Sequence, residues 1–338
     1  MRAGNKPTVS IASLDGIDFC VMENIRHLYS KLGASCIIGR RAMPADVLVL
    51  VRGTTAEINC DGYQQVHVYN YVGHDLSNMV LRNCSEVVFI EGDASLAKLR
   101  PRIGDAEVCT ITGRHPVYPE LWAVAPRDIA YGVTHIGNRK YEETKRRHDV
   151  IQRSLEQAIL RTGAIVWGHG WETLLKPFQR KGLAPLTRVP ALFSQTSVTL
   201  GIRYSYQRQH QLISSRFWLA PLCGCPVLSE EPVLYESIPG VVFAPYATAA
   251  EIRDSTNYSE RQILASESAA FWRLKTAVIE ESLEHQMASL RPREFSPWYR
   301  AMCEVTYRTE RIAAVNLPSL TSRMRQFVRM LRYSDLPR

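Results

Sequence analysis

The sequence predicts an α/β protein made of two doubly wound, Rossmann-like domains followed by a helical C-terminal segment. Three observations predict this fold class. Short apolar runs alternate with helical patterns, a proline-rich stretch interrupts this rhythm, and the same rhythm then starts again. The chain has 338 residues, of which 46% are hydrophobic and 22% are charged, so it is long enough and apolar enough for two domains with cores of their own.

In the first part of the chain, strands are predicted at short apolar runs. Residues 46–51 (DVLVLV) form a continuous apolar run, which is typical of a strand buried on both faces of a parallel sheet. A helix is predicted where Ile25, Leu28 and Leu32 recur at helical spacing. The strands expected here are 8–12, 35–38, 46–51, 65–71, 86–90 and 107–111, with helices at 23–32 and 95–99.

Pro116, Pro119 and Pro126 mark the crossing between the two domains, because proline interrupts both helices and strand ladders. We therefore expect a first domain at 1–118, a second domain at 127–290 and a basic helical segment at 291–338. The strands expected in the second domain are 129–136, 164–167, 198–202, 226–229 and 241–244, with helices at 141–161, 208–222 and 248–253 and a mainly helical chain from residue 259.

Several function classes are disfavoured by what the sequence lacks. The loop after the first strand reads Ser13-Leu14-Asp15-Gly16, so the dinucleotide fingerprint is missing there, and the chain has no P-loop motif. No Asp-x-Asp motif or cluster of His and Cys predicts a metal site. No apolar run is long enough for a membrane span and the start has no signal-peptide pattern, so we expect a cytoplasmic protein with reduced cysteines.

The segment 194–246 carries a resemblance to a known family. Residues 216–228 (RFWLAPLCGCPVL) match the shape of a helix that reads roughly R-x-F-E-A-x-A-C-G, followed by an apolar strand. Residues 240–243 and the Glu251-Ile252 pair match the strand and the helix start that close the same domain. The chain thus resembles GT-B glycosyltransferases, especially the branch similar to spore-maturation glycosyltransferases, well over 115–290 and by architecture alone over 1–114.

This resemblance implies a GT-B fold whose two domains face each other across a cleft. It implies that the first domain binds the acceptor and that the second binds a nucleotide-diphosphate sugar, with a UDP-sugar favoured. The expected reaction moves a hexosyl group to a hydroxyl of a glycan during cell-surface polysaccharide assembly. Neither a metal nor another cofactor is expected, because helix dipoles and basic side chains carry the leaving diphosphate in this family.

Two basic segments are expected to bind the donor phosphates. The first, residues 137–140, follows a predicted strand and precedes a predicted helix, so that backbone N–H groups and cations are both present. The second, residues 214–216, includes an arginine of the predicted helix 208–222. An ordinary solvated helix start and a surface arginine are the simpler interpretations. The residues are Gly137, Asn138, Arg139, Lys140, Ser214, Ser215 and Arg216.

The nucleobase, ribose and sugar are expected to contact three further strand-end segments. The residues are Gly168, His169, Gly170, Arg203, Tyr204, Glu230 and Glu231. The chain departs from the family at Leu219, where many GT-B enzymes use a carboxylate to bind the donor ribose. Glu230 and Glu231 are the proposed substitutes. A plain glycine turn is the simpler interpretation of residues 168–170.

Acid–base chemistry is expected in the first domain. His74 and Asp75 follow a predicted strand, and Asp15 follows the first strand, with Asp18 close by in the sequence. If the reaction inverts the sugar configuration, one of them takes the proton from the acceptor hydroxyl. If configuration is retained, no dedicated base is required and His74 would hold the sugar.

The last 48 residues hold ten arginines against four acidic residues, so most of the formal net charge of +8 lies there. An amphipathic helix at 319–333 would suit an anionic membrane, where a lipid-linked glycan acceptor is found, and would place the protein at the inner membrane face. The alternative is a helix that crosses back onto the first domain, as many GT-B chains have.

Three other functions remain open. A phage-type transferase that glycosylates modified nucleic-acid bases suits a basic protein, but the excess charge lies in the tail rather than along the expected cleft. A non-catalytic nucleotide- or sugar-binding module suits the missing carboxylate at Leu219. A sugar epimerase of the same architecture would act without an acceptor.

Overall fold

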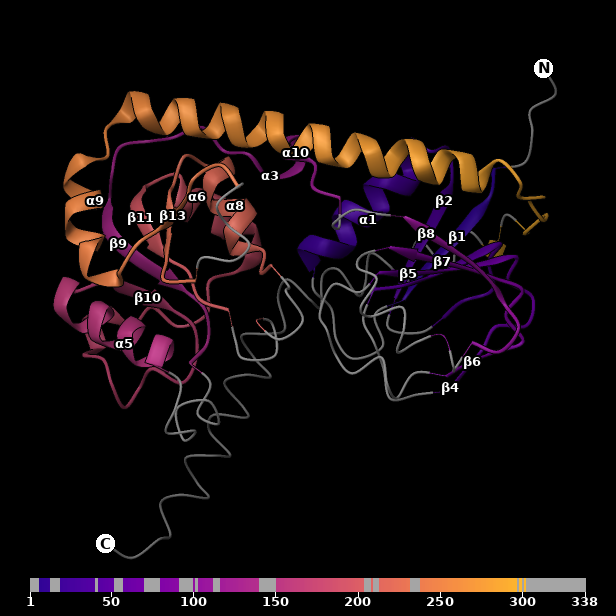
Figure 1. Cartoon of the computed structure of the whole chain (residues 1–338), viewed down its shortest axis with the longest axis horizontal. Helices are drawn as coiled ribbons and strands as arrows, with labels where there is room; N and C mark the ends of the chain where they lie inside the picture. Colours follow the sequence, from indigo (N-terminus) through magenta and orange to yellow (C-terminus); the bar gives the residue numbers. More distant parts are fainter. Residues whose placement is uncertain are drawn as a thin grey trace, which may run out of the picture.

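A computed structural model of the chain describes two parallel sheets joined by a proline-rich crossing and spanned by one long helix (Figure 1). The described residues are 6–12, 19–39, 42–51, 57–69, 80–90, 100, 103–111, 116–139, 150–203, 208, 213–231, 238–296, 298–299 and 301.

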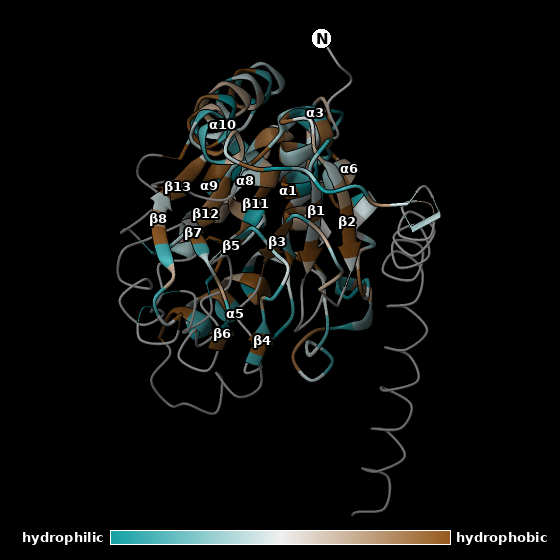
Figure 2. Cartoon of the chain, turned by 90° about the vertical axis from the view of Figure 1, so that its right-hand side faces the viewer, coloured by the Kyte–Doolittle hydropathy of each residue, from teal (hydrophilic) through white to brown (hydrophobic). Residues whose placement is uncertain are grey.

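The first sheet has six strands in the order β2-β1-β3-β5-β7-β8, and every neighbouring pair is parallel. β1 (Thr8–Ala12) and β3 (Val47–Leu50) are buried at every position, as expected for central strands covered on both faces. In Figure 2 the hydrophobic colouring of β1 and β2 marks this buried sheet. The other strands are β2 (Ser35–Gly39), β5 (Gln65–Tyr69), β7 (Glu86–Ile90) and β8 (Glu107–Ile111).

Helix α1 (Phe19–Lys31) packs on this sheet and buries Ile25, Leu28 and Tyr29 in its core. Beside the two main sheets, β4 (Glu57–Asn59) and β6 (Val80–Arg82) form a small two-stranded parallel sheet that was not predicted from the sequence. β4 has only three residues and buries one of them, so it offers too short a pattern to be recognised.

The second sheet has five parallel strands in the order β10-β9-β11-β12-β13. Since β9 comes first in the chain and its two neighbours come next, the winding direction reverses between β9 and β11. The strands are β9 (Tyr131–Ile136), β10 (Ile165–Trp167), β11 (Thr196–Leu200), β12 (Val227–Ser229) and β13 (Val241–Phe243). The helices are α3 (Pro119–Trp122) in the crossing, α5 (Val150–Thr162), α6 (Val189–Phe193), α8 (Arg216–Leu222) and α9 (Ala249–Ser255), with short 3₁₀ turns at Pro177–Gln179, Leu186–Arg188 and Tyr246–Thr248.

Helix α10 (Tyr258–Met287) spans both domains, as its course along the top of Figure 1 shows. It begins with a capping box between Asn257 and Glu260. Its first half buries Trp272 in the core of the second domain, and its second half buries Leu283 and Met287 in the core of the first. The two Rossmann-like domains and this helix confirm the predicted GT-B fold class.

The chain that follows α10 is bound to the first domain through Asp46, which is fully buried before β3. Asp46 accepts hydrogen bonds from the backbone N of Thr8 (2.8 Å) and from the backbone N of Arg293 (3.0 Å). The Arg293 guanidinium forms an ion pair with the same carboxylate at 3.2 Å. The first residues of the basic segment therefore lie on the first domain.

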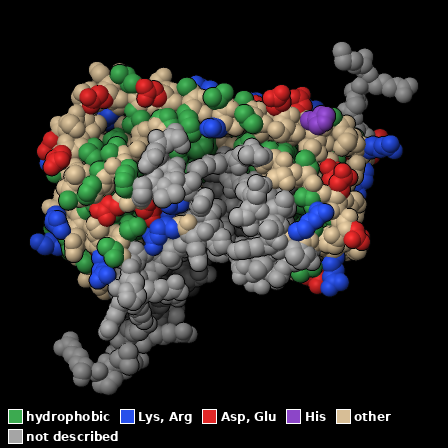
Figure 3. All heavy atoms as spheres, viewed as in Figure 1, with side chains coloured by type: hydrophobic (Ala, Val, Ile, Leu, Met, Phe, Trp, Pro, Cys, Tyr) green, Lys and Arg blue, Asp and Glu red, His purple; other side chains and the backbone are tan. Residues whose placement is uncertain are grey.

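On the face drawn in Figure 3, acidic and basic side chains are mixed over both domains. None of the helices in the described part of the chain has the length and apolarity needed to cross a bilayer. The predicted amphipathic helix at 319–333 lies outside the described residues.

Candidate functional site

The candidate site lies at the carboxyl edge of the second sheet, where β9 and β11 end side by side. In open parallel sheets, ligands bind at this edge where the winding direction reverses. β9 leads into Gly137, β11 into Gly201 and β12 into Glu230, so the loops of the three strands meet here. Five of the predicted site residues lie outside the described residues: Asp15, His74, Asp75, Lys140 and Tyr204.

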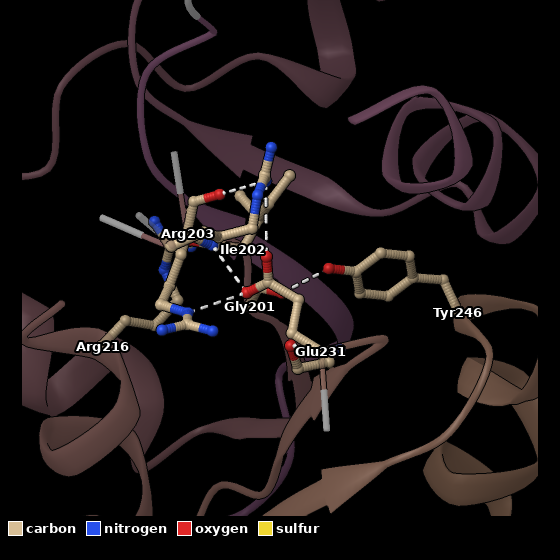
Figure 4. A network of polar contacts seen from close by, with 8 residues as sticks. Gly201, Ile202, Arg203, Arg216, Glu231 and Tyr246 are labelled. Atoms are coloured by element: carbon tan, nitrogen blue, oxygen red, sulfur yellow. Dashed lines mark hydrogen bonds and ion pairs between the residues drawn. The ribbon is translucent and has the colours of Figure 1, made fainter. Parts of the chain in front are cut away.

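Arg216, the first residue of α8, lies at the point where the winding reverses. Its Nη2 donates a hydrogen bond to the carbonyl of Ile136, the last residue of β9. Its Nη1 donates to the carbonyl of Ile202, just after β11, at 3.4 Å. The guanidinium thus joins the ends of the two strands and adds a positive charge between them. Figure 4 shows Arg216 together with Gly201, Ile202 and Arg203.

Gly137 makes room for this arginine. A Cβ atom at position 137 would overlap the Nη2 of Arg216 and would lie 3.0 Å from the Nε2 of His135. Ser214 precedes the helix, and its buried hydroxyl has no hydrogen-bond partner among the described residues. Ser215 is the N-cap residue of α8, but its side chain makes no capping hydrogen bond.

The loops after β9 and β10 pack tightly against each other. The backbone N of Gly137 donates to the carbonyl of Trp167 (2.8 Å), and the backbone N of His169 donates to the Oδ1 of Asn138 (2.8 Å). Gly168 has a φ of 150°, and a Cβ there would overlap the carbonyl oxygen of Gly137. The close approach made possible by this glycine is between two loops. The contact of residues 168–170 with the donor stays a prediction.

Arg139 forms an ion pair with Glu156 of α5. Its Nε donates to Glu156 Oε1 at 2.7 Å and its Nη2 to Glu156 Oε2 at 3.2 Å. The side chains are only 12% and 13% exposed, so this bidentate pair is largely shielded from water. Arg139, which is predicted to bind the donor phosphates, therefore has a carboxylate partner within its own domain.

Glu231, after β12, binds two arginines. The Nε of Arg203 donates to Glu231 Oε2 at 3.2 Å, and the Nη1 of Arg208 donates to Glu231 Oε1 at 3.3 Å. Arg203 and Glu231 are both buried. Arg208 is not among the predicted site residues. Its basic side chain, in the segment between β11 and Arg216, is the sequence feature that could have indicated it.

Glu230 is also held by the protein. Its Oε1 accepts hydrogen bonds from the Ser154 hydroxyl and from the backbone N of Tyr246, both at 2.7 Å. The phenol of Tyr246 donates to the carbonyl of Gly201, and its pKa is raised by burial and then by the nearby Glu231 and Glu230. Both glutamates expected to substitute for the missing carboxylate thus have protein partners.

Leu219 has 2% of its surface exposed and lies in the apolar core formed around Phe217 and Trp218. A carboxylate at this position would be buried in the core in the present arrangement. This placement explains why a leucine is tolerated there: it fills the core beneath the site.

His135 was not predicted as part of the site. Burial, together with the positive charge of Arg216, lowers its pKa to about 3, so the imidazole is neutral near pH 7. Its Nδ1 donates to the carbonyl of Leu200 at 2.9 Å, and its ring packs edge-on against Trp171. Because the imidazole of His135 is neutral, it adds no charge to the positive charge of the Arg216 guanidinium beside it.

No group of three or more His, Cys, Asp or Glu side chains within the described residues is placed to hold a metal ion. The charged side chains described in the site are the guanidinium groups of four arginines and the carboxylates of three glutamates: Arg139, Arg203, Arg208, Arg216, Glu156, Glu230 and Glu231.

Residues 146–291 match the family described as "Glycosyl transferase-like". The matched residues include the loops after β10, β11 and β12 and helix α8, whereas the loop after β9 precedes them. A comparison with curated proteins found no match to the sequence.

Three solved glycosyltransferase structures are similar to the chain. AviGT4, a glycosyltransferase involved in avilamycin A biosynthesis, is 13% identical with a TM-score of 0.49, over 83% of this chain and 98% of that one. The spinosyn forosaminyltransferase SpnP is 9% identical with a TM-score of 0.41, over 84% and 100%. An α-glucosyltransferase in complex with UDP and a 13-mer DNA is 9% identical with a TM-score of 0.43, over 82% and 95%.

Proposed function

We propose that the protein is a glycosyltransferase that takes a sugar from a nucleotide-diphosphate sugar bound at the carboxyl edge of its second sheet. The observation that carries the proposal is the guanidinium of Arg216 between the ends of β9 and β11, and Arg216 lies within the residues that match the glycosyl transferase-like family. A UDP-sugar is the donor that we favour, in keeping with the resemblance to the spore-maturation branch.

The chemistry needs a group that stabilises the departing nucleoside diphosphate. When the bond between the sugar and the diphosphate breaks, negative charge grows on the phosphate oxygen. Arg216 supplies a fixed positive charge at that edge, and the neutral His135 beside it adds no competing charge. The Ser214 hydroxyl is a further hydrogen-bond donor for the phosphates. No step of this scheme requires a metal ion.

The proposal places the acceptor on the first domain and assigns acid–base chemistry to His74, Asp75 or Asp15. We propose a glycan as the acceptor, either free or linked to a lipid, with the basic C-terminal segment binding an anionic membrane surface at its cytoplasmic side. The described start of that segment is held on the same first domain through Asp46 and Arg293.

A thermal-shift screen tests the donor proposal. UDP, GDP, CDP and dTDP are added to the wild type and to Arg216→Gln, which retains a hydrogen-bonding side chain but removes the charge. A ligand at 100 times its Kd should stabilise the wild type by about 2.7 kcal/mol. We expect one diphosphate to raise the melting temperature of the wild type and to have a much smaller effect on Arg216→Gln.

Arg253→Gln is the matched control, because Arg253 lies against Gly132 near the amino end of β9, at the opposite edge of the same sheet. It should respond to the nucleotides as the wild type does. If none of the four nucleotides stabilises the wild type at millimolar concentration, the donor proposal is wrong.

A non-catalytic nucleotide-binding module is the second candidate. It is favoured by the burial of Leu219 and by the protein partners of Glu230 and Glu231, which leave these two carboxylates engaged within the domain. Release of UDP from UDP-glucose distinguishes the two candidates. A glycosyltransferase should hydrolyse the donor slowly or transfer its sugar to an added acceptor, whereas a binding module should bind it and leave it intact.

A further inference from the structure

Two cysteines follow the two strands of the small sheet in the first domain. Cys60 comes directly after β4, and its backbone N donates a hydrogen bond to the carbonyl of Arg82, the last residue of β6, at 2.8 Å. Cys84 is the second residue after β6. Neighbouring strands lie about 4.8 Å apart, and a disulfide joins residues whose Cα atoms are about 4.4–6.8 Å apart. Residues on neighbouring strands are therefore close enough for a disulfide bond.

Asn83 breaks the regular alternation of side chains at the end of β6. Ile58 of β4 and Leu81 of β6 are paired across this sheet, and both are buried. A regular continuation of the two strands would therefore place Asn83 beside Cys60 on the buried face. Asn83 instead has a φ of 56°, in the left-handed region, and its side chain is exposed. The next residue, Cys84, can thus turn toward the buried face.

The side-chain amide of Asn83 holds this turn, and the two thiols meet beneath it. The amide donates hydrogen bonds to Asn59 Oδ1 at 3.1 Å and to Asp61 Oδ2 at 3.2 Å, on the two residues that flank Cys60. Cys84 packs against the apolar cluster that contains Cys60. The two thiols are joined by a hydrogen bond. The fold therefore brings together two sulfur atoms that are separated by more than 20 residues of sequence.

The two thiols differ in exposure and in acidity. Cys60 is 1% exposed, whereas Cys84 is partly exposed and lies between two exposed residues, Asn83 and Ser85. The hydrogen bond between the thiols lowers the pKa of Cys84 and raises the pKa of Cys60, and burial raises the pKa of Cys60 further. Because the thiolate is the attacking species, these properties favour Cys84 as the thiol that reacts first.

We propose that Cys60 and Cys84 are a redox-active pair that a small disulfide, such as glutathione disulfide, converts into an intramolecular disulfide bond. The thiolate of Cys84 attacks one sulfur of the oxidant, whose S–S bond breaks and releases one glutathione thiolate. Cys60 then gives up its proton and attacks the sulfur of Cys84, which releases the second thiolate. The protein loses two electrons and two protons, and the oxidant is reduced to two thiols. The pair lies in the first domain, apart from the donor site, so this inference does not depend on the proposed function.

Peptide mapping tests the pair on the full-length protein. The folded wild type is treated with glutathione disulfide, the remaining thiols are blocked with iodoacetamide, and the protein is digested with trypsin. Trypsin cleaves between the two cysteines, after Arg82, and gives the peptides 53–82 and 83–98 with one cysteine each. We expect these peptides to be joined, with a mass two hydrogen atoms below their sum. If they are not joined, or if Cys84 is joined to another cysteine instead, the proposal is wrong.

Two single variants test the order of the steps. In Cys60→Ser, Cys84 should stop at the mixed disulfide with glutathione, because the second thiol is missing. In Cys84→Ser, the buried Cys60 should react at least about 10-fold more slowly than Cys84 does in Cys60→Ser. Equal rates would overturn the assignment of Cys84 as the first thiol. If Cys60→Ser does not fold, Cys60→Ala takes its place with the same expected result, since alanine adds no polar atom to the buried site.

Cys109→Ser is the matched control. Cys109 is a partly buried thiol of β8 in the same domain, and its Sγ accepts a hydrogen bond from Gln286 Nε2 at 3.0 Å. This variant should give the joined peptides 53–82 and 83–98 in the same yield as the wild type. In concentrated urea, where the fold no longer selects the partner of each thiol, the yield of this one pairing should fall. An equal yield in the folded and the unfolded protein would show that the fold does not direct the pairing, and the proposal would fail.

Discussion

Gly137 and Gly168 lie in the paired loops after β9 and β10, and an added methyl group should affect them differently. At Gly137 it would overlap the end of the flexible Arg216 side chain, which can move. At Gly168 it would overlap the backbone of Gly137, at a φ of 150° that L residues rarely adopt. We expect Gly137→Ala to cost less than about 1 kcal/mol of stability but to weaken diphosphate binding about 10-fold. Gly168→Ala should cost about 3 kcal/mol.

Urea denaturation and nucleotide calorimetry on both variants measure these effects. If Gly137→Ala bound the diphosphate as tightly as the wild type, the position of Arg216 between β9 and β11 would not matter for binding. If Gly168→Ala were as stable as the wild type, the contact between the two loops would not be rigid.

Helix α10 links the two domains through side chains on its buried face. Leu283 is fully buried in the core of the first domain, although the helix begins on the second. Truncating it leaves a cavity, so Leu283→Ala should lower the free energy of unfolding by about 2–5 kcal/mol. Leu274, on the same helix, is 68% exposed, and Leu274→Ala should change it by less than about 0.5 kcal/mol. Denaturant titrations of both variants measure the contrast, and equal effects would mean that α10 does not pack on the first domain as described.

The whole molecule should lose stability in mild acid because each domain buries a neutral histidine. Burial lowers the pKa of His67 in the first domain and of His135 in the second to about 3. In the unfolded chain a histidine has a pKa of about 6.5. Between these values the unfolded state binds a proton that the folded state does not, so stability falls as the pH falls. Each histidine should contribute up to about 1.4 kcal/mol per pH unit between about pH 6.5 and pH 3.

Urea titrations at pH 7, 6, 5 and 4 measure this dependence. His135→Gln should make the fall in stability with pH less steep, because the variant lacks the contribution of one histidine. An unchanged slope in His135→Gln would show that this imidazole is protonated in the folded protein.

Many strands could be predicted from the sequence because their signal is local. The run at 46–51 contains β3, and the order of apolar runs on each side of the prolines gave two sheets. The same local reasoning missed β4 and β6, whose three-residue runs are too short to show a period. It also extended the helix before Leu222 back to residue 208, whereas α8 begins at Arg216 and residues 209–212 lie outside the described part of the chain.

The sequence by itself determined which residues are basic, which are small and which elements they follow, because these are properties of neighbouring residues. It therefore indicated Arg216 and Gly137 as candidates. The tertiary structure alone decided their partners, since those partners come from different strands. It places Arg216 between β9 and β11, pairs Arg139 with Glu156 and brings Arg208 to Glu231. These contacts join residues that are between 14 and 80 positions apart, so the periodic pattern of apolar residues along a helix or strand does not predict them.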